Sequence, residues 1–402
     1  MGKKLTYLLI LLSVVLSYCT SFEKEKENTF YSGSLKKMTV RSVKINYSNK
    51  EILYEIVERQ SNFRPIENII SIKSIKITKV KSIEKKSNCN FILKAKFIDF
   101  PFYNKIVTCQ NKYFSINFDN DIFNNTDFYY TNGINFEFIN HIFEHSPLMK
   151  LMLPYRGSSI NYYGISLVQN MYTPTNPDIE YVLIGDRPFS AYLYIGHFKV
   201  SNDVSKKFRQ TSKLNIGLIG SNALGGFVQQ TIHDIELQGW KHQISNDIVL
   251  NYSVKFEKSL FSSKNIEING MLDGSVGTLY NKVGLGFLTR MGRFNPYFNG
   301  ISYCDEYSRK KDNFRKIRYY FFAKVQSYLI GYDATLQGGV LNRTSIYTID
   351  NKNINRTVFR GSAGIVFSLS RFSLELEQVF LSPEFDTGLF HKWLHINTRF
   401  CF

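Results

Sequence analysis

"WLHINTRFCF", residues 393–402, ends the chain with a nearly regular alternation of apolar and polar side chains. Apolar Leu394, Ile396, Phe400 and Phe402 share one face, and polar His395, Asn397 and Arg399 share the other. A period of two residues indicates a β-strand. An apolar face and a polar face over about ten residues are typical of a strand that crosses a membrane as part of a barrel.

The same alternation returns along the chain from about residue 112. "TNGINFEFINHI", residues 131–142, sets Ile134, Phe136 and Phe138 against Asn135 and Glu137. Twelve such stretches lie near residues 113, 131, 160, 188, 213, 247, 264, 276, 315, 356, 371 and 392. Lipid offers no hydrogen bonds, so strands can cross it only as a closed barrel, and bacterial single-chain barrels have an even number. We therefore predict an all-β fold, a twelve-stranded antiparallel transmembrane β-barrel over residues 111–402. A soluble β-sandwich is the structural alternative.

The N-terminus predicts export. Residues 1–19, "MGKKLTYLLILLSVVLSYC", have a Lys pair followed by a short apolar run, as in a secretory signal peptide. Cys19 is a candidate lipidation site, although Tyr18 is bulky where lipoprotein signals have a small residue. Residues 20–110 are charged and then alternate Ile or Val with Lys, Ser or Thr, which predicts a small β-rich periplasmic extension. The terminal Phe402 resembles the signal that the barrel assembly machinery binds, so we expect insertion into a bacterial outer membrane.

Composition and charge narrow the partners. The 402 residues carry a formal net charge of +17, which suits an anionic partner, either nucleic acid or a phosphate-bearing membrane surface. No zinc-finger or aromatic RNA-binding signature is present, and an exported barrel predicts no nucleic acid. The basic stretches 206–212 and 305–316 would, as extracellular loops, face the phosphates of lipopolysaccharide, or they are ordinary solubilising residues.

The five cysteines, Cys19, Cys89, Cys109, Cys304 and Cys401, lack metal-ligand spacing. Export allows a disulfide between Cys89 and Cys109, and two buried thiols are the alternative.

One polar helix interrupts the strands. "SNALGGFVQQTIHDIELQGW", residues 221–240, places Gln229 and His233 on one helical face, with Glu236 a turn further on. His233 is the residue of this stretch that can remove a proton near neutral pH. The Gly-rich start would expose backbone N–H groups for an anion. A single histidine is more often structural.

Oxygen ligands gather where the first two barrel strands meet. In "INFDNDIFNNTDFYYTNGINF", residues 116–136, Asp119, Asn120 and Asp121 end one strand, and Thr131 lies near the start of the next. Clustered oxygens at adjacent strand ends suit a hard cation such as Ca²⁺. Ordinary turns are also rich in such residues.

These motifs together resemble the outer-membrane lipid A 3′-O-deacylase family, of the LpxR type. "NDIF…DFYYTNGI", "YTP…IGDRPFSAYLYIG", "IGLIGSNALGGFVQQTIHDI…GWKHQI", "LQGG" and "LSPEFDTG…HINTRFCF" occur in the family's order, over about residues 112–402. The resemblance implies a Ca²⁺-dependent esterase that removes the 3′-linked acyloxyacyl chain of lipid A in the outer leaflet. It implies a site between the barrel wall and a short helix, formed by His233 as general base with Asn120, Asp121, Thr131, Gln229 and Glu236. Ca²⁺ would lie near Asp121, with Asn120 and Glu236 as further ligands.

Two departures from the family keep other functions open. The family's Lys-Arg pair is replaced by residues 177–180, Pro-Asp-Ile-Glu, and the catalytic glutamate has only a gapped counterpart in Glu236, with Asp234 as the second choice. Strand parity also places Asn120 on the lipid side unless a bulge intervenes. A phospholipase or another glycolipid esterase on the same barrel is one alternative, and a non-catalytic structural or binding barrel is the other. Besides lipid A and outer-membrane lipids we expect no stable partner, and therefore a monomer.

Overall fold

The computed structural model describes residues 38–47, 50–59, 106–108, 112–121, 128–178, 180–233, 238–301, 317–369 and 371–402. The predicted signal peptide, four of the cysteines (Cys19, Cys89, Cys109 and Cys304) and Glu236 lie outside these residues. The chain divides into two compact units, Met1–Ile98 and Asp99–Phe402. In the first unit, β1 (Met38–Tyr47) pairs with β2 (Lys50–Arg59) as an antiparallel hairpin.

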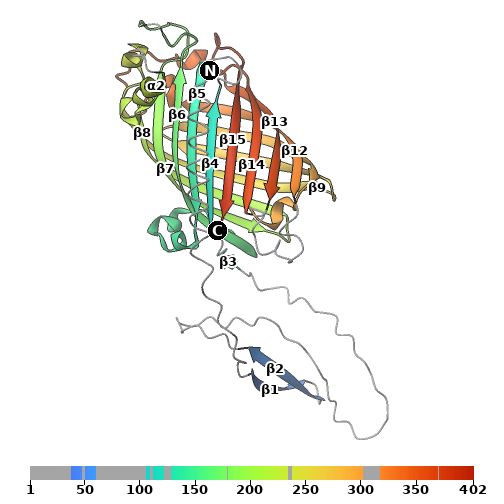
Figure 1. Cartoon of the computed structure of the whole chain (residues 1–402). Coiled ribbons are helices and arrows are strands. Elements are labelled where there is room, and N and C mark those ends of the chain that lie inside the picture. The colour runs from blue at the N-terminus through green and yellow to red at the C-terminus, as the bar shows by residue number, and fades with distance from the viewer. Residues whose placement is uncertain are drawn as a thin grey trace, which may run out of the picture. The chain divides into compact units, whose positions relative to one another are not determined.

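The second unit is a closed barrel of twelve antiparallel strands, as predicted (Figure 1). Each strand pairs with its neighbours in the chain; β4 pairs with β15, and β6 pairs with β7 as well as β5, which closes the ring. The strands are β4 (Tyr113–Asn120), β5 (Tyr129–Ile139), β6 (Ser159–Thr173), β7 (Ser190–Asp203), β8 (Phe208–Ile219), β9 (Asp247–Ser262), β10 (Ile266–Gly277), β11 (Tyr280–Arg293), β12 (Arg318–Asp333), β13 (Thr357–Leu369), β14 (Phe372–Leu381) and β15 (His391–Cys401). Each strand begins within five residues of a predicted position. The short β3 (Ile106–Thr108) adds in parallel to the start of β6.

The described helices are short and lie in the connections. They are η3 (His141–His145), η4 (Pro147–Leu151), η5 (Ser221–Ala223), α2 (Gly225–His233), η6 (Gln238–His242), η7 (Tyr297–Asn299), α3 (Ala334–Gln337) and η9 (Asn351–Asn353). None of the helices in the described ranges is long and apolar enough to cross a membrane.

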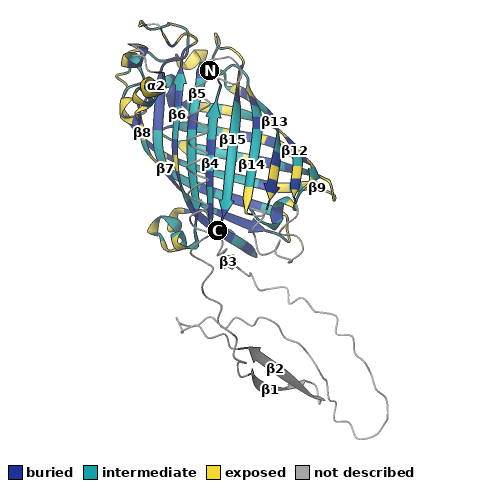
Figure 2. Cartoon of the chain, in the orientation of Figure 1, coloured by how far each residue is buried: buried dark blue, intermediate teal, exposed yellow. Residues whose placement is uncertain are grey.

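The two faces of the wall divide as the alternation predicts. Along β15, His395 pairs with Asp119 and Asn397 with Asn117, and these side chains hydrogen-bond across the lumen side. The outer face carries large apolar side chains that are exposed, shown in yellow on the strands in Figure 2. They include Leu167, Ile195, Leu250, Leu272, Leu285, Phe321, Val325, Phe367 and Phe380. This belt is what a lipid environment requires of a barrel.

Several charged side chains of the lumen form ion pairs. Arg290 lies 2.7 Å from Glu267, and Lys255 lies 3.0 Å from Glu257. Burial of an unpaired charge would cost several kcal/mol, so these ion pairs lower the free-energy cost of placing charged side chains in the lumen.

Two rims bound the barrel. The α2 rim carries the connections that contain α2 and α3, and the C-terminal rim carries the chain end and the connections between β7 and β8 and between β11 and β12. Of the two basic stretches, residues 206–212 span the end of the β7–β8 connection and the start of β8, and residues 305–316 lie outside the described residues. The expectation that such basic loops face the phosphates of lipopolysaccharide stays a prediction. Cys401, buried at this rim, is disulfide-bonded to a partner outside the described residues.

Candidate active site on the outer wall

Helix α2 lies against the outer face of β6 and β7 near the α2 rim (Figure 1). Met171 and Ala191 point outward from these strands and form one buried cluster with Ala223, Phe189 and Trp240. Gln169 Nε2 donates to the Ala223 carbonyl at 2.7 Å and fastens the start of the helix to β6. The helix therefore covers the wall from outside and leaves the lumen to other segments.

The glycine pair at the start of α2 makes this close approach possible. A Cβ at Gly225 would lie 2.3 Å from Ala191 Cβ and 3.0 Å from the Trp240 ring, and one at Gly226 would lie 3.2 Å from Trp240 Cγ. Both positions face the wall and the indole. Packing thus explains the two glycines, and the anion site expected at this start of the helix stays a prediction.

The first strand separates its three Asx residues. Asn120 pairs with Leu394 on one side and with Asn132 on the other, so it belongs to the outer face, as its parity predicts. Asp121, 1% exposed, accepts a hydrogen bond from the Phe128 N–H at 3.0 Å. Asp119 points into the lumen, on the opposite face of β4 from Asn120, so its expected grouping with Asn120 is wrong.

Thr131 sits in a β-bulge. The register between β5 and β6 shifts between Tyr130 and Asn132, so that Thr131 is the extra residue next to Met171. Its hydroxyl lies 3.5 Å from the Met171 carbonyl, and the side chain is buried. Because Met171 belongs to the cluster beneath α2, the bulge connects the β4–β5 strand ends to the helix.

Gln229 faces the wall from the helix. Its side chain is 4% exposed, whereas Phe227 and Gln230 on the other face are exposed. Gln229 Oε1 is buried with no hydrogen-bond partner among the described residues. His233 ends α2 one turn later, but its side chain lies outside the described set, as does the whole of Glu236. The structure thus places Asn120 on β4, Asp121 directly after it, Thr131 on β5 and Gln229 on α2, and leaves their common site and the roles of His233 and Glu236 as predictions.

Comparisons with known proteins decide the family. The family model described as "Outer membrane protein LpxR" matches residues 97–399. The chain belongs to the LpxR family. Among solved structures, LpxR from Salmonella typhimurium is similar with a TM-score of 0.56 at 22% identity, over 72% of this chain and 100% of that one. The β domain of the Bordetella autotransporter BrkA gives a TM-score of 0.37 at 9% identity, over 72% and 98% of the chains. A comparison with curated protein sequences gave no match.

Membership in the LpxR family places the chain in the outer membrane as a β-barrel and supports an enzyme that acts on lipid A. The likeness to the Salmonella structure confirms the barrel fold.

The oxygen donors of the site suit the hard cation expected of an LpxR-type site. A carboxylate, amide oxygens and a hydroxyl are supplied by Asp121, Asn120, Gln229 and Thr131, and no nitrogen or sulfur ligand stands among these four. The unsatisfied Gln229 Oε1 is a buried acceptor of the kind that a cation or a substrate hydrogen-bond donor would satisfy. The described residues therefore fit Ca²⁺ in donor type.

The "GDRPFSA" block, residues 185–191, contains a buried arginine for which the sequence patterns indicate no role. Arg187 is 1% exposed; its guanidinium pairs with Glu384, donates to Thr335 Oγ1 at 2.7 Å and stacks on Tyr172. Burial lowers the pKa of Arg187, but Glu384 and Asp333 outweigh it and raise the pKa above its usual value. Arg187 thus ties three connections of the α2 rim together. The only sequence feature that could have indicated this role is the position of the arginine between Asp186 and Pro188.

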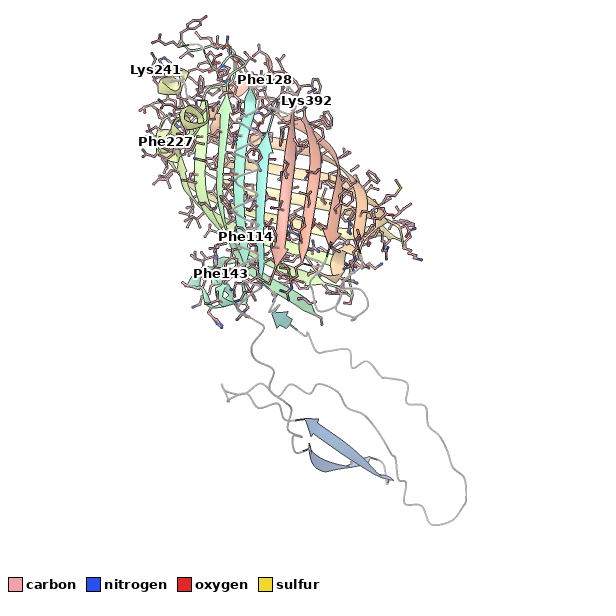
Figure 3. All side chains as sticks on the ribbon, viewed as in Figure 1. Phe114, Phe128, Phe143, Phe227, Lys241 and Lys392 are labelled. Atoms are coloured by element: carbon pink, nitrogen blue, oxygen red, sulfur yellow. The ribbon has the colours of Figure 1, made fainter. Side chains whose placement is uncertain are left out.

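Lys241 forms an ion pair with Glu180, the last residue of the stretch 177–180 that replaces the Lys-Arg pair expected from the resemblance. Glu180 Oε1 lies 2.5 Å from Lys241 Nζ, and both side chains are exposed. Lys241 lowers the pKa of Glu180 through this hydrogen bond and its charge. Lys241 stands beside α2 at the same rim as Phe227 (Figure 3). Glu180 therefore neutralises a lysine beside α2.

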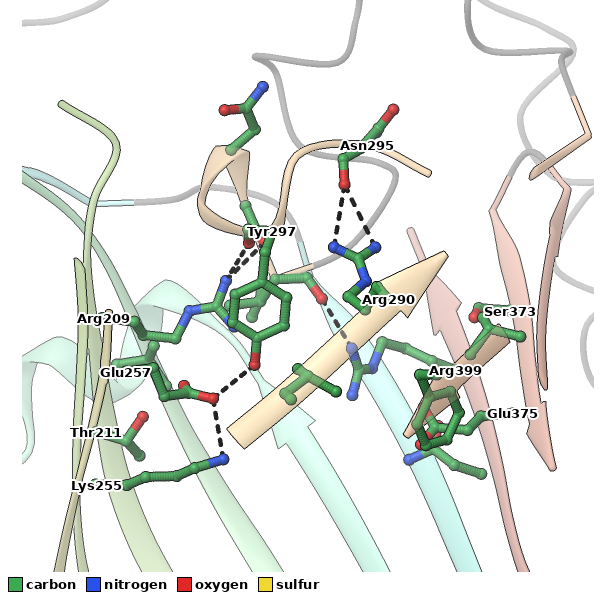
Figure 4. A pocket seen from close by; sticks show the side chains of 18 of the residues that line it. Arg209, Thr211, Lys255, Glu257, Arg290, Asn295, Tyr297, Ser373, Glu375 and Arg399 are labelled. Carbon is green, nitrogen blue, oxygen red and sulfur yellow. Dashed lines mark hydrogen bonds and ion pairs between the residues drawn. The ribbon is translucent and has the colours of Figure 1, made fainter. Parts of the chain in front are cut away.

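The lumen holds a cavity of about 420 Å³ near the C-terminal rim (Figure 4). Residues 295–301, before β12, line one side of it. Arg209 donates to the Tyr297 and Gly300 carbonyls at 2.6 and 3.0 Å, and Arg399 donates to Ile301 at 2.8 Å. These arginines hold the segment inside the barrel, on the opposite face of the wall from α2.

Proposed function

We propose that this protein is a Ca²⁺-dependent lipid A 3′-O-deacylase that works in the outer leaflet of the outer membrane. One observation supports the proposal: Asn120 belongs to the outer face of β4, and α2, which carries the buried Gln229, packs on the outer face of β6 and β7. A lipid substrate can reach such a site sideways from the bilayer. LpxR family membership supports the substrate class.

The proposed reaction is hydrolysis of the ester at the sugar 3′-oxygen. His233 takes a proton from a water molecule whose oxygen attacks the ester carbonyl carbon. The tetrahedral intermediate expels the 3′-oxygen, which receives the proton from His233, and the acyloxyacyl chain leaves as a carboxylic acid. Gln229 and Thr131 would orient the ester and the water by hydrogen bonds.

Bound Ca²⁺, held by Asp121, Asn120 and Glu236, would supply positive charge that stabilises the oxyanion of the intermediate. Asp121 is already held at the strand end by the Phe128 N–H. This contact fixes the carboxylate before substrate arrives, which reduces the cost of ordering it.

The test compares lipid A from cells that express the wild type, His233→Ala or Gln230→Ala. Gln230 is an exposed residue of the same helix and serves as the matched control. Mass spectrometry should show loss of the 3′-linked acyloxyacyl chain with the wild type and Gln230→Ala. Loss of the general base should slow the reaction by ~10²-fold or more. An unchanged acylation pattern with folded wild type in the membrane would rule the proposal out.

A phospholipase on the same scaffold is the second candidate, and Glu180 favours it. A carboxylate paired with Lys241 leaves less positive charge for the phosphates of lipid A. Release of fatty acid from phospholipid vesicles by purified protein, with lipid A left intact, would select this activity.

A further inference from the structure

A carboxylate on the lumen face joins three neighbouring strands behind the candidate site. Asp119 Oδ2 accepts a hydrogen bond from the Tyr130 hydroxyl at 2.9 Å, and its Oδ1 lies 2.7 Å from His395 Nδ1. These residues come from β4, β5 and β15. We call Asp119, Tyr130 and His395 the inner clamp.

The clamp holds Tyr130 in one position. Its ring packs edge-on against Trp393, with ring centroids 5.0 Å apart, and lies tilted against Tyr172 at 5.3 Å. The Tyr130 hydroxyl lies against Gly133, where an added Cβ would lie only 1.9 Å from the hydroxyl oxygen. A glycine at this point is therefore required for the tyrosine to reach Asp119.

The outer side of the same strands carries the candidate site. Asn120 follows Asp119, and Thr131 follows Tyr130. The register shift falls between Tyr130 and Asn132, so the residue held inside by the clamp is the one that precedes the bulge. A bulge re-aims the side chains of its strand, and it keeps its place only when neighbouring contacts fix the register.

We propose that Asp119 and Tyr130 are positioning residues, which act through the bulge to place Thr131 and Asn120 for ester hydrolysis. The inference rests on the proposed function for its catalytic part. The clamp touches no substrate, because it faces the lumen and the site faces lipid. The clamp instead fixes the register of β5 against β6 at Thr131. A displacement of about 1 Å at a reacting group can cost about 10²-fold in rate.

A comparable lumen contact exists away from the site and supplies the control. Gln326 Nε2 donates to the Tyr328 hydroxyl at 2.6 Å on β12. Tyr328→Phe removes a lumen hydroxyl of the same kind, on a strand that pairs with neither β4 nor β5. A purely structural role would give the two Tyr→Phe variants the same effect.

The experiment measures kcat and KM of Tyr130→Phe, Asp119→Asn and Tyr328→Phe on lipid A in detergent micelles. Amide hydrogen exchange at Thr131 and Asn132 is recorded on the same samples. We expect kcat to fall about tenfold or more in both clamp variants with KM within about twofold, because the defect is one of placement. Exchange at the two amides should accelerate in these variants only. Tyr328→Phe should match the wild type in both measurements.

The outcomes separate the inference from the proposed function. An active wild type with unchanged kcat in both clamp variants overturns the inference and leaves the proposed function standing. An inactive wild type overturns the proposed function, and amide exchange then decides the inference: faster exchange at Thr131 in Tyr130→Phe supports the clamp's control of the bulge, and unchanged exchange refutes it.

Discussion

Arg187 and Thr335, which are 148 positions apart in the chain, meet in the buried centre of the α2 rim, where the guanidinium Nη2 donates to the threonine hydroxyl at 2.7 Å. The same guanidinium pairs with Glu384 and lies 4.2 Å from the Tyr172 ring centroid. One side chain thus connects the loops that follow β6, β12 and β14. The helix that bears the candidate site starts from this same rim.

Replacement of Arg187 by leucine should destabilise the barrel strongly. The change leaves the carboxylate of Glu384 and the buried Asp333 without their cation, which costs about 3–5 kcal/mol when one partner of a buried pair is removed. Thermal unfolding in detergent measures the loss. Lys352→Ala, at an exposed lysine of the same rim, should leave the unfolding temperature unchanged. Equal temperatures for the two variants would contradict a stabilising role of Arg187.

Alanine at Gly225 should lift α2 from the wall. Its Cβ would meet Ala191 at 2.3 Å, and overpacking of this kind costs about 1–3 kcal/mol. Because Gln229 belongs to the same helix, esterase activity should fall together with the free energy of unfolding. Gly361→Ala is the matched control, since no atom lies within 4 Å of a Cβ built there. Activity equal to wild type in Gly225→Ala would show that α2 tolerates displacement.

A lysine at position 180 should restore phosphate recognition. The wild-type carboxylate neutralises Lys241; the lowered pKa of Glu180 means that the ion pair is present at neutral pH and is lost only as the pH falls through that pKa. Glu180→Lys should therefore lower KM for phosphorylated lipid A several-fold at neutral pH, and salt at ~0.5 M should remove the gain. Asp350→Lys makes the same charge change at another exposed residue of this rim and should leave KM unaltered. If the KM of Glu180→Lys for phosphorylated lipid A equalled that of the wild type, the substrate phosphate would contact other residues.

The strands could be predicted from the sequence because lipid and lumen impose opposite polarity on alternate residues. This rule placed His395 and Asn397 inside and Leu394 outside, and it placed Asn120 on the lipid side. It fails where alternation stops. Nothing in "YYTN" marks Thr131 as a bulge, since all four residues tolerate either face.

The contacts that join distant segments were out of reach for a different reason. Arg187 meets Glu384 across 197 positions, and Tyr130 reaches Asp119 only because Gly133 leaves room. Local patterns carry no information on such pairings. Periodicity alone also gives Asp121, Thr131 and Gln229 no common site, so their grouping rests on the family resemblance and stays a prediction.

Removal of calcium should abolish hydrolysis, and Asp121→Asn should raise the Ca²⁺ concentration required. A buried carboxylate is the strongest of the described oxygen donors, so its neutralisation should shift the half-saturating Ca²⁺ concentration by about tenfold or more. Activity titrated with Ca²⁺ after chelation gives this number. Asp350→Asn, an exposed carboxylate, should titrate like the wild type. Full activity of the wild type in excess chelator would exclude a calcium requirement.

Loss of the arginines that hold residues 295–301 should open the lumen. Arg209 binds two carbonyls of the segment and Arg399 binds a third, and a backbone segment released from such donors would expose polar groups that water can satisfy. The double variant Arg209→Ala, Arg399→Ala should therefore conduct ions in planar bilayers at a level well above the wild type. Lipid A hydrolysis should persist, because α2 and its site lie on the outer face of the wall. If the double variant instead lost hydrolysis and did not conduct ions, the arginines would stabilise the barrel as a whole. Conductance and hydrolysis together therefore distinguish a segment that blocks the lumen from one that supports the fold.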